Sequence, residues 1–434
     1  QQTREAWEYA LQSEAVREWL DVAEQRADDP PENTVGFAAS LGFFVRYFSP
    51  PPDRIGEETV PLLARVRTIA ETLTERLDGS PAAHNAAAEA AWFLGDVKSV
   101  KAHSEPVAER GECPVSAEAV VASGAAASAR IRLARIELHA LENAPDSEKE
   151  ERLEKASETV NEAVANLNRN SNARRHLEAE LALLQNRPLA VLAELAEDRP
   201  RRPTLLNPLH YCVARAFMQT AHLGAAAEML AQIRRNGGLG LAPFEFDRAE
   251  EALVEVRLLL KRPEQAAKIA EQWEVYGNPE GWKTRPKRWL LIERIRVNRT
   301  PDPAESLAAA ERLEALVPSL PDSIRDDTVL LCCMAYDRAG RLQYATEFLE
   351  QYVRHEKAPK TTLRVTLIRR RIRDGETEAA HELAGALPSF LPEGRVKREL
   401  EDKTPEQRCS PAVLLLLQSS ALAPTESEFG WFAY

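Results

Sequence analysis

Adjacent thiols at Cys332 and Cys333 are the first residues in this chain whose chemistry stands out, because neighbouring thiols can sense redox state or bind soft metal ions. The chain has five cysteines with no C-x-x-C pair, and this odd number is unlike a disulfide framework or a zinc site. Both thiols also fall on the close-packed face of a predicted helix, where a thiol acts as a small hydrophobe. We therefore interpret the pair as packing residues.

Other motifs that carry chemistry are missing from the sequence. It contains no G-x-S-x-G, Walker A, H-E-x-x-H or EF-hand pattern, and its eight histidines show no ligand spacing. The run Gly237-Gly238-Leu239-Gly240 follows a predicted helix and not a strand, so we interpret it as a helix C-cap and loop. We expect no catalytic residue, no cofactor and no metal, with an enzyme of unrecognised site kept as an alternative.

Composition restricts the remaining functional classes of protein. The chain has 434 residues with 56 Lys and Arg against 68 Asp and Glu, a net charge of -12 that argues against general nucleic-acid binding. Its densest aliphatic run, Val413 to Leu417, is far shorter than the roughly 18 residues of a membrane span. Reduced thiols favour a cytoplasmic location. The sequence begins at Gln1 without a methionine, so export after removal of a leader is the alternative.

The elements that must position any site are helices, because helix formers and three- and four-residue apolar steps dominate. Short breaks rich in Gly and Pro separate them, and one turn pattern recurs. Asn186-Arg187-Pro188 aligns with Lys261-Arg262-Pro263, with the turn at Gly340 and with the turn at Gly375. The small or apolar residues that follow lie 35 to 40 residues apart, the period of a helix-turn-helix repeat. They are Val191, Ala226, Ala266, Ser306, Ala345 and Ala380.

The copy with Tyr336, Gly340, Ala345 and Leu349 resembles the tetratricopeptide repeat (TPR) superfamily. The resemblance implies an all-α fold, a right-handed α-solenoid of TPR-like helical hairpins with a helical N-terminal lobe. We predict an N-terminal lobe or cap over 1–80, degenerate hairpins over 81–170, the repeat array over 171–405, and a capping helix with an aromatic tail over 406–434. The turn from Asn298 to Pro303 is longer than in the other copies.

The resemblance also implies a concave groove that holds a protein partner. By register, the groove residues are His176, Glu180, Tyr211, Arg215, Glu251, Glu255, Leu330, Met334, Val365 and Arg369. A basic surface is expected from two arginine-rich stretches, with Lys283, Arg285, Lys287, Arg288, Arg370 and Arg373. At the C-terminus, four aromatic residues are expected either to cap the last repeat or to anchor a partner or a second copy. They are Phe429, Trp431, Phe432 and Tyr434.

We therefore predict a non-enzymatic scaffold or adaptor, a subunit of a larger complex that binds protein partners through the groove and its terminal elements. The first alternative is a regulatory or sensor protein that binds a peptide or small ligand, and a compact fold around a pocket would favour it. A helical-repeat RNA binder is the minor alternative.

Overall fold

The computed structural model describes residues 14–27, 37–38, 40–42, 45, 59–109, 117–142, 144, 148–165, 167–168, 171–196, 207–238, 241–356 and 361–385. Helix accounts for 83% of these residues and none of them forms a strand, which confirms the all-α prediction. None of the described helices combines the length and apolar character needed to cross a bilayer. The chain divides into two compact units, 1–250 and 251–434, called unit 1 and unit 2 below.

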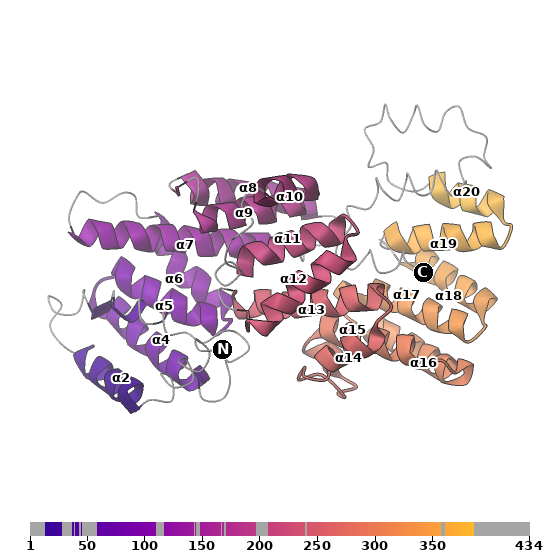
Figure 1. Ribbon diagram of the computed structural model, residues 1–434, viewed down its shortest axis with the longest axis horizontal. Helices are drawn as coiled ribbons and strands as arrows, with labels where there is room; N and C mark the ends of the chain where they lie inside the picture. Colours follow the sequence, from indigo (N-terminus) through magenta and orange to yellow (C-terminus); the bar gives the residue numbers. More distant parts are fainter. Residues whose placement is uncertain are drawn as a thin grey trace. The chain divides into compact units, whose positions relative to one another are not determined.

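In unit 1, helices that follow one another in the sequence pack side by side (Figure 1). They are α2 (Glu14–Arg26), α4 (Thr59–Arg76), α5 (Pro81–Phe93), α6 (Val97–Glu109), α7 (Ala117–Glu142), α8 (Lys149–Ala165), α9 (Asn172–Leu184), α10 (Pro188–Ala196), α11 (Asn207–Gln219) and α12 (Leu223–Arg235). Helix α13 (Pro243–Leu259) contributes its first turns to unit 1 and the remainder to unit 2.

Unit 2 repeats this sequential packing. Its further elements are α14 (Pro263–Ala270), the 3-10 turn η3 (Gly281–Lys283), α15 (Pro286–Arg299), α16 (Pro303–Leu316), the 3-10 turn η4 (Val317–Ser319), α17 (Asp322–Arg338), α18 (Leu342–His355), α19 (Thr361–Arg373) and α20 (Thr377–Gly385). One hydrophobic core runs from Trp289 on α15 to Leu367 on α19.

The turn between the two helices of a pair has the same backbone geometry in most pairs. The residue two places before the second helix has a positive φ at Gly95, Asn186, Ala221, Lys261, Gly340 and Gly375, with values from 56° to 82°. In the turn at Gly340, the Arg341 amide donates to the Tyr336 carbonyl at 2.8 Å and the Gly340 amide to the Asp337 carbonyl at 3.0 Å. This is a Schellman closure, and equivalent bonds close the other five turns.

The residues predicted to mark the repeat occupy one structural position. Val191, Ala226, Ala266, Ser306, Ala345 and Ala380 each lie three residues after the start of their second helix, and each is no more than 2% exposed. Val100 has the same place in α6 and is 1% exposed, so the predicted degenerate copy around Gly95 shares the geometry. These regularities are consistent with helical repeats.

One pair departs from this pattern. Between α15 and α16 there is no positive-φ residue, and the Asp302 side chain instead accepts from the Ala304 amide at 3.0 Å as an N-cap. The sequence predicted a longer turn at this place. The described part of the N-terminal lobe does not have a core of its own, because Leu20 on α2 and Leu63 on α4 share one apolar cluster with Ala86 on α5.

Candidate functional site

A cluster of buried titratable side chains lies in unit 1, at the centre of four helices. Each helix contributes side chains at three- or four-residue spacing, which places them on one helix face. The set, called the charged cluster below, comprises Arg135, His139 and Glu142 from α7, His176 and Glu180 from α9, Tyr211 and Arg215 from α11, and Glu245 and Arg248 from α13.

Glu245 is fixed by two helices at once. The Nε of Arg135 donates to Glu245 Oε1 at 2.7 Å, and a second nitrogen of the same guanidinium donates to Oε2. The Ala242 amide also donates to Oε2, at 2.8 Å. Because Ala242 precedes the first residue of α13, this last bond is half of a capping box. The Glu245 carboxylate therefore both begins α13 and ties it to α7.

Two further carboxylates share two arginines. Arg215 lies 2.9 Å from Glu142 and 3.6 Å from Glu180. Arg248 also pairs with Glu142 and lies 3.6 Å from Glu180. Both guanidinium groups sit over the ring of Tyr211, 5.6 and 5.7 Å from its centroid. Three arginines thus face three glutamates, and the charges of the cluster balance.

His176 lies among these charges as a neutral imidazole. Burial, together with the nearby cations Arg135 and Arg215, lowers the pKa of His176 to about 3. Its Nε2 lies 3.6 Å from Glu180 Oε2. A neutral ring of this kind does not exchange protons at physiological pH, so its role here is packing and hydrogen bonding.

His176, Glu180 and Glu245 offer ligand atoms that all lie within 4.8 Å of one another, the arrangement of a metal site. However, a cation there would have to displace Arg135 from Glu245 and would meet a cluster whose charges already balance. The donor set therefore does not fit a divalent cation.

Aromatic contacts close the cluster on the side of α5. The rings of Trp92 and Phe244 lie 5.2 Å apart, edge to face, and the ring of His139 lies 4.8 Å from that of Phe244. The guanidinium of Arg135 lies over Trp92, 4.7 Å from the ring centroid. Helices far apart in the sequence therefore converge on this cluster.

Four of the predicted groove residues belong to this cluster. His176, Glu180, Tyr211 and Arg215 are brought together as the register predicted, but each is at most 6% exposed. Glu180 on α9 and Arg215 on α11 are interior as partners across the two helices, and His176 lies beside Glu180 on its own helix.

The groove residues predicted in unit 2 are also mainly interior. Glu251 lies 3.5 Å from Arg288, and Glu255 lies 3.7 Å from Arg294. Leu330 and Val365 are 3% and 1% exposed. The half-buried members of the predicted set are Met334 and Arg369.

The predicted basic surface is partly wrong. Arg288 and Arg370 are only 5% and 7% exposed, because Arg288 stacks on Trp273 and Arg370 forms a bidentate pair with Asp337. The other four residues do reach the surface. Each of these lies beside a carboxylate: Lys283 by Glu280, Arg285 by Glu274, Lys287 by Glu251 and Arg373 by Asp374.

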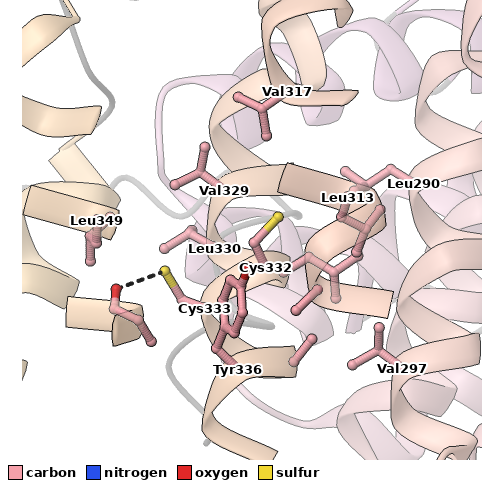
Figure 2. Packing of buried hydrophobic residues seen from close by; sticks show 14 of the residues in the cluster. Leu290, Val297, Leu313, Val317, Val329, Leu330, Cys332, Cys333, Tyr336 and Leu349 are labelled. Carbon is pink, nitrogen blue, oxygen red and sulfur yellow. Dashed lines mark hydrogen bonds between the residues drawn. The ribbon is translucent and has the colours of Figure 1, made fainter. Parts of the chain in front are cut away.

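The adjacent thiols lie in the core of unit 2, as the packing interpretation predicted. Figure 2 shows Cys332 and Cys333 among Leu330, Leu313 and Tyr336, with the Cys333 thiol donating to the Ala345 carbonyl at 3.6 Å. Burial raises the pKa of Cys333 to about 12 and that of Cys332 well above its usual value. Neither thiol is therefore poised as a nucleophile.

One pair of histidines that the sequence did not predict lies between two helices. Nδ1 of His84 on α5 lies 3.1 Å from Nδ1 of His103 on α6. No fixed spacing reveals this pair, since the contact crosses two helices. The available signal was the hairpin turn at Gly95, which brings residues on either side of it together.

The described helices thus define an all-helical protein of packed hairpins with ion-paired interfaces. No protein-family model matches the sequence, and no curated protein is found to be similar to it. The predicted anchor Phe429, Trp431, Phe432 and Tyr434 lies outside the described residues.

Proposed function

We propose that the chain is a TPR-like α-solenoid that acts as a non-enzymatic scaffold for partner proteins. The observation that carries this proposal is the repeated hairpin: six turns of the described helices share one backbone geometry, and seven second helices bury the residue at the same position. Stacked hairpins expose two helix faces and a row of loops, which is the surface that helical-repeat proteins offer to partners.

The state of the reactive groups supports a binding role. The buried thiols Cys212, Cys332 and Cys333 have raised pKa values because burial disfavours the thiolate. The carboxylates of the charged cluster are engaged by arginines, and His176 is neutral. In the described residues these groups therefore act as structural elements.

Because most of the predicted groove residues are interior, we propose a different docking surface. Leu342 and Tyr344 at the start of α18 are large apolar side chains that are 45% and 46% exposed. The Tyr344 hydroxyl donates to Glu314 at 3.1 Å, which holds the ring in place, edge-on to Tyr336. A fixed, exposed tyrosine is typical of residues that dominate interface energy. We propose that the partner contacts the start of α18, where both side chains are exposed.

Copurification from the native source with quantitative mass spectrometry tests the proposal. We expect a stoichiometric protein partner that is lost when Leu342 and Tyr344 are both replaced by Asp. The matched control is Leu189→Asp, at a leucine 71% exposed on α10 in unit 1, which should retain the partner. Absence of any stoichiometric partner contradicts the scaffold, whereas a partner retained by the double variant contradicts only the proposed surface.

Pairing of the basic side chains supports a protein partner over RNA. Across residues 283–299, all seven Lys and Arg side chains lie within 4 Å of a carboxylate. A phosphate backbone would have to compete with these carboxylates.

A sensor that binds a peptide or small ligand is the second candidate. The convergence of α5, α7, α9, α11 and the start of α13 on the charged cluster favours it, because these helices meet around polar side chains that are largely removed from solvent. A peptide or small anion that raises the melting temperature of the wild type, but not of Arg248→Met, would support this candidate over the scaffold.

A further inference from the structure

His84 and His103 form a contact between helices that the proposed scaffold does not use. The Nδ1 atoms of the two rings face each other at 3.1 Å, and the ring centroids lie 5.3 Å apart. Both side chains are half-buried. Two neutral imidazoles can face each other in this way only if one of them carries its proton on Nδ1 and the other does not.

Glu71 on α4 lies behind the ring of His103. Its carboxylate lies 3.7 Å from Nε2 of His103, the nitrogen on the far side of that ring. This carboxylate also lies 3.6 Å from Arg67. A proton on Nε2, which the nearby carboxylate favours, would leave the Nδ1 lone pair of His103 facing His84. A carboxylate behind an imidazole is the usual support of a metal-binding histidine.

The spacing of the two nitrogens matches a metal-coordination edge. Imidazole nitrogens bind Zn²⁺ at roughly 2.0–2.1 Å, so two such ligands at 90° to 110° lie about 2.9 to 3.4 Å apart. The observed separation is 3.1 Å. A metal ion between the rings would require His84 to move its proton from Nδ1 to Nε2, a change of tautomer without loss of a proton.

The charges nearby also differ from those of the charged cluster. There, three arginines occupy the carboxylates that a metal would need. At the histidine pair, the two facing ligand atoms are ring nitrogens, and Glu71, which is paired with Arg67, stands behind His103. A divalent cation there would replace the N–H···N hydrogen bond between the two rings.

We propose that His84 and His103 bind one divalent transition-metal ion, with Zn²⁺ as the reference ion, and so clamp α5 to α6. Solvent completes the coordination, and Glu71 is a positioning residue that orients the His103 ring. The ion is of the borderline-soft class that imidazole prefers over Mg²⁺ or Ca²⁺.

Calorimetric titration of the full chain with Zn²⁺ tests the site. We expect one saturable site whose affinity falls at least tenfold in His84→Gln and in His103→Gln. Glu71→Gln should weaken binding by about tenfold, because the loss of a supporting carboxylate typically costs 10- to 100-fold in affinity. The matched control is His355→Gln, at an exposed histidine on α18, which should bind as the wild type does.

A second measurement on the unaltered protein keeps the proposal falsifiable if a variant does not fold. Diethylpyrocarbonate modification, mapped by peptide mass spectrometry, should become slower at His84 and His103 when Zn²⁺ is added, and should stay unchanged at His355. Equal modification rates with and without Zn²⁺ would overturn the proposal. So would equal Zn²⁺ affinity in folded His84→Gln and wild type.

Discussion

Residues at one turn position carry backbone strain that their side chains do not explain. Asn186, Ala221 and Lys261 have φ values of 56°, 60° and 56°. Residues other than glycine rarely adopt this left-handed region. The equivalent position is glycine in three other turns. The fold therefore imposes the conformation, and the residue type only changes its energetic cost.

Replacing residues at this position should change stability in opposite directions. Ala221→Gly should raise the free energy of unfolding by about 0.5 kcal/mol, since relief of left-handed strain exceeds the extra entropy of unfolded glycine. Gly340→Ala should lower it by about 1 kcal/mol, and only through the backbone, because no atom lies within 4 Å of an added Cβ. Urea denaturation measures both. As a control, Gly224→Ala inside α12 should stabilise by about 0.5 to 1 kcal/mol.

His176 should make stability depend on pH in a defined window. Its pKa is about 3 in the folded protein and about 6.5 when unfolded, so only the unfolded state gains a proton between these values. Stability is complete above about pH 6.5 and is lost as the pH falls toward 3, by up to about 1.4 kcal/mol per pH unit. Between about pH 7 and 5.5, His176→Gln should lose about 1 kcal/mol less stability than wild type in urea denaturation. An equal loss in both proteins would show that folding does not lower the pKa of His176.

At the scale of elements, buried ion pairs connect successive first helices of the hairpins. The pairs are Glu89–Arg132 between α5 and α7, Glu180–Arg215 between α9 and α11, Glu251–Arg288 between α13 and α15, and Asp337–Arg370 between α17 and α19. Because a buried charge without its partner is costly, a shift in the register of two helices would leave charges unpaired. These pairs therefore select one packing of each interface.

Arg215 and Arg285 offer a direct comparison of buried and exposed pairs. Arg215→Ala leaves Glu142 and Glu180 without this partner in the interior and should lower the free energy of unfolding by about 3 to 5 kcal/mol. Arg285 is 49% exposed beside Glu274, so Arg285→Ala should change it by less than about 0.5 kcal/mol. Chemical denaturation of the two variants measures both changes in the free energy of unfolding. Equal effects would mean that Arg215 is hydrated in solution.

At the scale of the whole molecule, thiol reactivity reports whether both cores are formed. The chain has five cysteines, of which Cys212, Cys332 and Cys333 are buried. Ellman's reagent should label no more than the other two in the native protein and all five in denaturant. Rapid labelling of a third thiol without denaturant would contradict the described packing.

The structure does not describe the C-terminal aromatic residues, and their role as a cap or an anchor remains a prediction. Deletion of Phe429 to Tyr434 should lower the melting temperature if the tail caps the last repeat, because an uncovered solenoid end exposes apolar surface. Loss of association with unchanged melting would indicate an anchor for a partner or a second copy. Melting curves and analytical ultracentrifugation distinguish the two, and no change in either would contradict both.

More of the fold than of the candidate site could be predicted from the sequence. Alignment of Asn186, Lys261 and Gly340 located the turns because a glycine at the turn or a proline two residues later marks each of these helix boundaries. The burial of Arg215 and Arg288 could not be predicted, because it depends on which carboxylate the neighbouring helix presents. An arginine on a helix face looks the same in the sequence whether it meets water or Glu180.

The Schellman turns have a consequence for how such a chain can diverge. Each turn is closed by main-chain donors and acceptors, which every residue except proline possesses. Substitutions at the turn therefore change its stability by a small amount and leave its geometry intact. Glycine at this position can therefore be replaced by alanine or lysine while the hairpin is preserved. As such replacements accumulate, the residues that identify the repeat in a sequence become fewer.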